Sequence, residues 1–268
     1  MGKVLITGCS TGIGRAAATE LTKRGHEVVA TARRPETLDD LDVAARLRLD
    51  VDDDASVRDA VSSAGAVDVL VNNAGFGVVG PVETLPLDEV ARMFQTNVFG
   101  AWRMIQAVLP GMRERGSGTI VNVTSLAGRV AAPLNGAYSA SKYALEALSE
   151  ALHYEVGHFG IRVAMIEPGR FTTNFGAREL RLGMDAPYDE LDLLWQEAQE
   201  KLPTGADPGA EPPGPEAVAA AIADAVEQPA TPLRVPVGTD AELVISTRAS
   251  MDDATFEATM RGVLGLDW

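Results

Sequence analysis

The sequence predicts an α/β fold, in which one doubly wound parallel sheet of about seven strands carries helices on both faces. Two observations support this prediction. Short segments that are apolar on both faces, as buried parallel strands are, alternate along the chain with helical segments. The glycine-rich and polar segments gather where these strands end, which is the edge at which such sheets bind ligands. We expect residues 1–268 to form a single domain.

The strands and helices are expected at defined places in the chain. A long helical pattern over 88–115 is interrupted by Gly100 and Pro110, and shorter helices are expected over 216–227 and 251–264. The expected strands are 3–7, 26–31, 47–50, 67–71, 119–124, 161–166 and 233–237.

The segment 171–215 departs from this alternation and is the candidate substrate lid. Apolar residues, among them Leu194 and Trp195, recur at helical spacing up to residue 202. Two interpretations remain open: a mobile lid over an apolar substrate, or a fixed helix that covers the core. The polar, proline-rich stretch 203–215 is interpreted as a hinge of the lid, because too little chain follows it for a second domain.

Composition excludes several classes of protein. A net charge of −15 argues against a nucleic-acid partner, and 46% hydrophobic residues are enough for a substantial core. No apolar run reaches the roughly 18 residues of a membrane span, and the N-terminus has no secretion signal. The single cysteine, Cys9, excludes an internal disulfide framework, and no His/Cys cluster has metal-ligand spacing. We therefore expect a soluble cytoplasmic protein with no metal, membrane or nucleic-acid partner.

A glycine-rich turn follows the first strand and precedes a helix. In that context glycines let the backbone approach a pyrophosphate, whose charge is stabilised by N–H groups at the start of the helix. The alternative is an ordinary tight loop. The residues expected to contact a dinucleotide here are Gly8, Ser10, Thr11, Gly12, Ile13 and Gly14.

The end of the second strand bears on the choice of cofactor. A carboxylate at this place in dinucleotide folds binds the ribose 2′-hydroxyl, whereas an arginine accommodates a 2′-phosphate. The sequence has Arg33 and Arg34 there and no carboxylate. This favours NADP(H), bound through Arg33, with NAD(H) as the alternative; a charged loop before Pro35 would also explain the pattern.

Polar residues also follow the third and fourth strands. Asp50 ends the third strand, where its carboxylate could accept a hydrogen bond from an adenine amino group or simply face water. The turn Asn73-Ala74-Gly75 follows the fourth strand, and its small residues would let a nicotinamide ribose approach. Both segments are therefore expected at the cofactor site.

Tyr138 and Lys142 are the candidate reactive pair. They lie four residues apart in a helical segment and so share one face, where a cation favours the phenolate and lowers the pKa of the tyrosine from its ordinary value near ~10. Ser125 follows the fifth strand and would offer a hydroxyl to a substrate oxygen. This combination suits carbonyl–alcohol chemistry with a hydride carrier. Asn97, in the middle of a helix, either has a hydrogen-bonding task or is a satisfied core amide.

Over nearly its full length the chain resembles the short-chain dehydrogenase/reductase family, with its Rossmann-type sheet. The block around Tyr138 is similar to the branch that contains 17β-hydroxysteroid and retinol dehydrogenases. Two departures stand out: Thr124 replaces a second serine, and Thr11 replaces a basic residue common in NADP enzymes. The motifs that carry the resemblance are Thr7-Gly8-x3-Gly12-x-Gly14, Asp50, Asn72-Asn73-Ala74-Gly75, Asn97, Ser125, Tyr138-x3-Lys142 and Pro168-Gly169 with Thr172.

The resemblance implies a catalytic tetrad. Tyr138 would be the acid/base, Lys142 would lower its pKa and bind the nicotinamide ribose, Ser125 would hold the substrate oxygen, and Asn97 would support a water relay to Lys142. Further cofactor contacts implied by the resemblance are Val51, Pro168, Gly169 and Thr172.

We therefore predict an NADP(H)-dependent oxidoreductase that interconverts a ketone or aldehyde and an alcohol on a hydrophobic substrate. The family also implies a homodimer or homotetramer, formed through the helices that carry Asn97 and Tyr138. An NAD-dependent alcohol dehydrogenase is the alternative, and a dinucleotide-binding regulator without catalysis is a second one.

Overall fold

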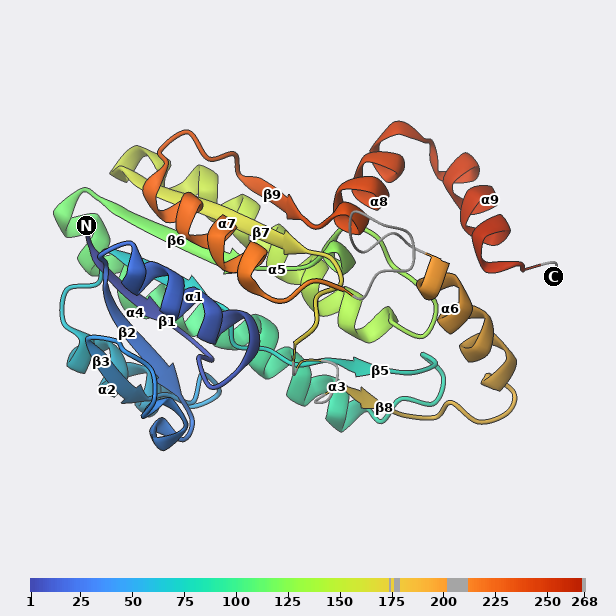
Figure 1. Ribbon diagram of the computed structural model, residues 1–268, viewed down its shortest axis with the longest axis horizontal. Helices are drawn as coiled ribbons and strands as arrows, with labels where there is room; N and C mark the ends of the chain where they lie inside the picture. The colour runs from blue at the N-terminus through green and yellow to red at the C-terminus, as the bar shows by residue number, and fades with distance from the viewer. Residues whose placement is uncertain (174, 176–178, 202–211, 267–268) are drawn as a thin grey trace.

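The computed structural model describes residues 1–173, 175, 179–201 and 212–266, and a seven-stranded sheet lies at its centre (Figure 1). The strands run in the order β3-β2-β1-β4-β6-β7-β9, and every neighbouring pair is parallel. The predicted doubly wound sheet is confirmed. Its strands are β1 (Lys3–Ile6), β2 (Glu27–Ala32), β3 (Ala45–Arg48), β4 (Val69–Asn72), β6 (Gly118–Val123), β7 (Ile161–Pro168) and β9 (Arg234–Val237).

The third strand lies two residues before its predicted place. The prediction of 47–50 relied on apolar residues, but β3 is an edge strand whose side chains alternate between half-buried and exposed. Arg46 and Arg48 are its exposed members, and Arg46 donates to the carbonyl of Leu38. The N–H of Leu49 still donates to the carbonyl of Ala32, so Asp50 follows the end of the pairing as expected.

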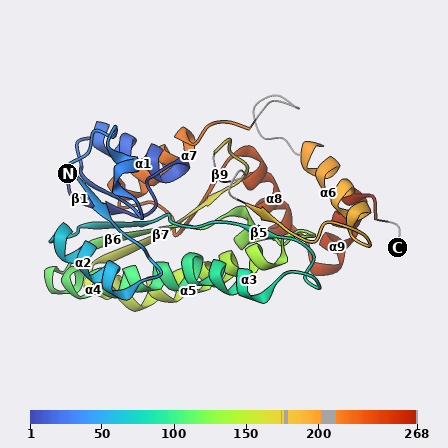
Figure 2. The same cartoon turned by 90° about the horizontal axis from the view of Figure 1, so that it is seen from below.

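Helices cover both faces of the sheet, with α1 and α7 on one and α2, α4 and α5 on the other (Figure 2). Strand β1 shows why both faces are apolar. Successive side chains alternate, so Val4 and Ile6 pack toward α1 and α7 while Leu5 packs toward α2, α4 and α5. The five helices are α1 (Gly12–Lys23), α2 (Asp54–Ala64), α4 (Ala101–Arg115), α5 (Gly136–Val156) and α7 (Glu216–Glu227).

The long helix predicted over 88–115 is continuous, although its centre is a π-helical turn. Helix α3 (Leu87–Phe94) leads through the π-helix η2 (Gln95–Gly100) directly into α4. Gly100 does not interrupt it: a Cβ there would lie 2.6 Å from a methyl group of Val51, so this glycine permits close packing against the loop after β3. Pro110 also lies within α4 without ending it.

A separate group of elements lies beyond the carboxyl ends of the strands (Figure 1). Helix α8 there was not predicted, and neither was the two-stranded parallel sheet of β5 and β8. Among the described residues, no helix is both long enough and apolar enough to span a bilayer. These elements are β5 (Val78–Val79), β8 (Leu180–Arg181), α6 (Asp189–Lys201), α8 (Thr239–Ser250) and α9 (Asp253–Leu264), and the short helical turns elsewhere are η1 (Pro35–Leu38), η3 (Leu126–Gly128) and η4 (Gly157–Phe159).

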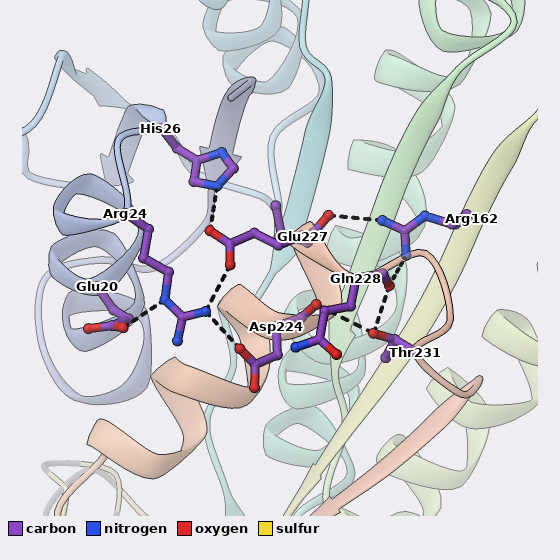
Figure 3. A network of polar contacts seen from close by, with 9 residues as sticks. Glu20, Arg24, His26, Arg162, Asp224, Glu227, Gln228 and Thr231 are labelled. Atoms are coloured by element: carbon purple, nitrogen blue, oxygen red, sulfur yellow. Dashed lines mark hydrogen bonds and ion pairs between the residues drawn. The ribbon is translucent and has the colours of Figure 1, made fainter.

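A cluster of polar contacts joins α1 to α7 (Figure 3). The guanidinium of Arg24 bonds to Glu20 at 2.8 Å, to Asp224 at 2.7 Å and to Glu227 at 3.0 Å. These carboxylates raise the pKa of Arg24. The ring of His26 lies 3.3 Å from the other oxygen of Glu227. One cation therefore links the two helices that cover this face of the sheet.

We expect Arg24→Met to lower the free energy of unfolding by about 1 kcal/mol, while methionine keeps the aliphatic part of the side chain. This value is the upper end for an isolated exposed ion pair, and we expect it here because Arg24 bonds to several carboxylates. Urea unfolding at low and at high salt measures the loss, which should shrink with salt. The control is Arg58→Met on an exposed site of α2, and equal losses for the two variants would contradict the role of the cluster.

Candidate active site

A cavity of about 1,230 Å³ runs along the carboxyl edge of the sheet. It brings together most of the site residues that the sequence predicted, although they come from six different strand ends and two helices. The predicted residues that line it are Gly8, Ser10, Thr11, Gly12, Ile13, Arg33, Asp50, Val51, Asn73, Ala74, Gly75, Ser125, Tyr138, Lys142, Pro168 and Gly169.

The glycine turn is fastened to the end of β4. The hydroxyl of Thr7 accepts hydrogen bonds from the N–H groups of Asn73 and Ala74, both at 2.9 Å. In return the side-chain amide of Asn73 donates to the carbonyls of Thr7 and Gly8. Gly8 has a φ of +75°, and a Cβ on this residue would lie 2.9 Å from the Cα of Ala74. The turn is therefore fixed to the end of the neighbouring strand by four hydrogen bonds.

Gly14 has a packing role in this turn. It is buried and does not line the cavity, unlike the other predicted residues of the turn. A Cβ on Gly14 would lie 2.5 Å from the carbonyl oxygen of Gly8 and closer still to the amide of Asn73. The third glycine thus brings the first turn of α1 against the strand-end backbone, and Gly12 and Ile13 at the start of that helix line the cavity.

The three reactive side chains converge from β6 and α5. Ser125 follows β6, and its Oγ accepts a hydrogen bond from the N–H of Ala127 at 3.0 Å. Tyr138 lies in the first turn of α5, and Lys142 lies one turn later. The ammonium group of Lys142 donates to the carbonyl of Val123 at 3.0 Å and lies 5.8 Å from the centre of the Tyr138 ring. The predicted group of Ser125, Tyr138 and Lys142 is therefore assembled around one point of the cavity.

Burial controls the ionisation of this pair. Burial is the main cause that raises the pKa of Tyr138, opposed by the hydroxyl of Ser125 and increased by the charge of Glu179. The direction predicted for the pKa of Tyr138 is wrong for this structure, because desolvation is the largest cause and raises it, and Lys142 is not among the groups that set it. Burial also lowers the pKa of Lys142 to about 8, with the charge of Glu146 acting against it. At neutral pH Tyr138 therefore holds its proton and can donate it.

Asn97 lies behind the site rather than in the cavity. Its amide accepts from the N–H of Phe76 at 3.0 Å and donates to the carbonyl of Phe76 at 2.9 Å and to Ser141 at 3.1 Å. A cavity of about 10 Å³ borders Asn97 and Val123, near the lower limit of space for one water molecule. The amide is thus buried and hydrogen-bonded, with Ser141 of α5 as a partner, and this geometry fits both predicted alternatives.

The cavity suits a dinucleotide at the end formed by β1, β2 and β3. Arg33 and Arg34 are exposed there, and no hydrogen bond or salt bridge joins Arg33 to a residue that the structure describes. Asp50 also borders the cavity, and one of its oxygens accepts from the N–H of Asp52. The glycine turn and the start of α1 fit a dinucleotide.

Thr172 lies outside the cavity lining. Its hydroxyl donates to the carbonyl of Pro212 at 2.5 Å, and its N–H donates to the carbonyl of Pro213. The neighbouring Thr173 borders the cavity.

Part of the predicted lid, including most of 203–215, lies outside the described residues. The described part contains the predicted amphipathic helix as α6, whose Trp195 and Ala198 line the cavity. Among the described residues no group of three His, Cys, Asp or Glu side chains could hold a metal ion.

The sequence did not predict most of the cavity's apolar wall. Helices α8 and α9 close the end beyond Tyr138, together with residues from β8 and the segments before it. The first turn of α8 carries acidic residues and its last turn carries Arg248, a pattern that could have marked the helix. The unpredicted lining residues include Phe76, Val130, Phe175, Glu179, Leu180, Leu243, Val244, Phe256, Met260 and Val263.

Known proteins share both this sequence and this fold. Residues 2–181 match the family model for short chain dehydrogenases. A 3-ketodihydrosphingosine reductase of Bacteroides thetaiotaomicron is 43% identical over 176 residues, which are 64% of this chain and 65% of the relative. Human retinol dehydrogenase 8 is 43% identical over 66% of this chain and 61% of its own. The match thus spans less than two thirds of each relative. A short-chain dehydrogenase structure from Streptomyces avermitilis covers 100% of this chain and 99% of its own at 38% identity, with a TM-score of 0.83.

We expect Gly14→Ala to destabilise the protein, because the added methyl group meets the carbonyl of Gly8 and the amide of Asn73. Overpacking of this kind costs about 1–3 kcal/mol, and thermal unfolding measures it. The matched control is Gly262→Ala in α9, where nothing lies within 4 Å of the new methyl group. That variant should be neutral or more stable by up to about 1 kcal/mol, since alanine favours a helix over glycine. A neutral Gly14→Ala would contradict the packing role of this residue.

Proposed function

The chain belongs to the short chain dehydrogenase family, and on that basis we propose that it is an NADP(H)-dependent oxidoreductase that interconverts ketones or aldehydes and alcohols on apolar substrates. One observation supports this most strongly. Ser125, Tyr138 and Lys142 border the same cavity as the glycine turn and Arg33, so a reacting carbon and a dinucleotide can share it.

In this proposal the hydroxyl of Tyr138 donates its proton to the carbonyl oxygen during reduction and accepts it back during oxidation. The hydroxyl of Ser125 holds the same oxygen and fixes its distance from the phenol. Lys142 places a charge beside the phenol while its bond to the carbonyl of Val123 keeps the ammonium group in position. The nicotinamide, when bound, supplies or accepts the hydride. Asn97 contributes by holding α5 through Ser141, and we propose that it also supports a water relay to Lys142.

Three groups of residues would hold the cofactor. The start of α1 and the glycine turn would bind the pyrophosphate. Asp50 and Val51 would contact the adenine, and the turn after β4 would contact the nicotinamide ribose. The exposed Arg33 would bind the 2′-phosphate, which favours NADP(H) over NAD(H). An NAD-dependent enzyme is the alternative, in which Arg33 and Arg34 contact solvent and do not bind the cofactor.

An apolar substrate is supported by the lining of the far end of the cavity. Side chains from α6, α8 and α9 form this wall, among them Trp195, Leu243, Phe256 and Met260. The names of two relatives, a 3-ketodihydrosphingosine reductase and a retinol dehydrogenase, are in keeping with an apolar carbonyl or alcohol. The body of the substrate would lie among these helices while its oxygen lies at Ser125 and Tyr138.

We also propose that two or four copies associate through α4 and α5. Large apolar side chains are exposed on these helices and the π-helical turn before them: Phe99, Trp102, Tyr143 and Tyr154, the last 72% exposed. Surfaces of this kind mark protein interfaces. A cytoplasmic site of action is proposed from the single free thiol, Cys9, which is buried.

Tyr138→Phe tests the assignment of the acid. Loss of the phenol removes the proton donor, so turnover with NADPH should fall by at least about 100-fold, the scale of general acid catalysis. Fluorescence titration should find NADPH affinity within about threefold of the wild type, because the ring and its packing stay. The control is Tyr188→Phe, at a residue that lies outside the cavity lining and whose hydroxyl bonds to Glu83. Retained turnover in Tyr138→Phe would overturn the assignment, and a wild type that binds dinucleotide but reduces no carbonyl would favour a regulator.

Arg33→Asp tests the cofactor preference. The carboxylate repels a 2′-phosphate and can accept from a 2′-hydroxyl, so the ratio of NADPH to NADH affinity should fall by about 100-fold or more. Separate titrations of the purified protein with each nucleotide give this ratio. Arg58→Asp, outside the cavity, should leave it unchanged. A wild type that prefers NADH, or an unchanged ratio in Arg33→Asp, would show that Arg33 does not select the cofactor.

A further inference from the structure

The carboxylate of Glu179 borders the apolar, substrate-binding end of the cavity. Asp240 of α8 is another carboxylate in the lining, and it accepts a hydrogen bond from the N–H of Arg170 at 2.7 Å. Glu179 comes directly before β8 and borders the cavity beside Leu180. Gly77 makes room for it, since a Cβ on that glycine would lie 3.2 Å from Cγ and 3.3 Å from Oε1 of Glu179. The same space is bordered by Phe175, whose ring packs against Tyr138 at 5.7 Å between centres. Glu179 is therefore separated from the acid of the site by a single aromatic neighbour.

The charge of Glu179 is poorly balanced by the protein. Its nearest cation is Arg181 at 3.9 Å, but Arg181 bonds directly to Asp192 at 2.5 Å. Within the described part of the chain Glu179 makes no hydrogen bond, although its side chain is only 24% exposed. This burial raises the pKa of Glu179. A half-buried carboxylate with no donor is a costly arrangement unless a ligand supplies one.

Besides Arg33 and Arg34, two further arginines border the cavity, and both bond to other groups. Arg92 lies 4.4 Å above the ring of Phe76 and bonds to Glu89. The guanidinium of Arg170 bonds to the carbonyl of Gln199. Neither has a hydrogen bond or salt bridge to Glu179. The cavity-lining neighbours that the structure places at Glu179 include Phe175, which shares the space at Gly77, and Leu180, which follows it in the chain, so apolar side chains flank the carboxylate.

We propose that Glu179 selects substrates with a hydrogen-bond donor, an ammonium or a hydroxyl group, close to the reacting carbon of an otherwise apolar molecule. The inference rests on the proposed function, because it takes Tyr138 and Ser125 to mark the reacting carbon. An ammonium group is the stronger ligand of the two, since its charge also balances the carboxylate. The net charge of −15 favours the approach of cations as well.

Three secondary alcohols with the same alkyl chain test this proposal. They differ only in the group beside the carbinol carbon, which ends in ammonium, hydroxyl or methyl. Binding to the enzyme in the presence of NADP is measured by calorimetry, and oxidation by the appearance of NADPH. The wild type should bind the ammonium compound at least about tenfold more tightly than the methyl compound, as expected for hydrogen bonds to a charged group. The affinity for the hydroxyl compound should lie between these two.

The variants assign this preference to Glu179. Glu179→Gln keeps the shape and an acceptor but removes the charge, so the ammonium preference should fall to within about threefold while the hydroxyl preference is partly kept. Glu179→Leu should lose both. The control is Glu155→Gln, on an exposed site of α5, which should behave as the wild type. An unchanged order of affinities in both Glu179 variants, or a wild type that binds the methyl compound as tightly as the ammonium one, would overturn the proposal. Binding as expected without oxidation of any of the three would keep the Glu179 site and contradict the proposed activity instead.

Discussion

The bond between the ammonium group of Lys142 and the carbonyl of Val123 holds the reactive centre together. Val123 is the last residue of β6, and Lys142 lies in the second turn of α5, so the bond fixes the first part of the helix against the end of the strand. Ser125 follows directly on one side and Tyr138 lies one turn away on the other. Because Lys142 is only 6% exposed, its charge is little screened by water and acts mainly on these neighbours.

A buried lysine needs support from other charges, and carboxylates of the same region provide it. Glu146 lies one turn after Lys142 and acts to keep its proton. Glu146 in turn accepts from Arg234 of β9 at 2.9 Å, and Glu167 at the end of β7 accepts from Arg129 at 2.9 Å. The carboxylate of Glu167 is fully buried, and burial raises its pKa. Charges thus link the first residue of β9 to α5, and the end of β7 to the residue that follows η3.

The two ends of the cavity differ in how closely the sequence predicts them. The cofactor end was predicted closely because local rules determine it: positive φ at Gly8, a helix start at Gly12 and short strands that end in polar residues. The ionisation of Tyr138 was predicted in the wrong direction, because spacing along a helix shows that Lys142 is near but not how far both groups are removed from water. The predicted place of the third strand was wrong because β3 lies at the edge of the sheet, where its side chains are less apolar than those of a central strand. Edge position is a property of the whole sheet.

The substrate end could not be predicted for a physical reason. Its wall comes from helices that pack on each other and on strand ends far away in the chain, and their short amphipathic patterns carry no sign of which neighbour they face. The sheet and its five covering helices fix the glycine turn, Ser125, Tyr138 and Lys142 through continuous apolar packing. Helices α6, α8 and α9 lie outside both of these core clusters, and each contributes side chains to the cavity lining. Changes in the lining residues of those helices therefore alter the substrate wall more directly than they alter the two core clusters. A polar residue such as Glu179 can remain in this wall because the stability of the sheet does not depend on packing there.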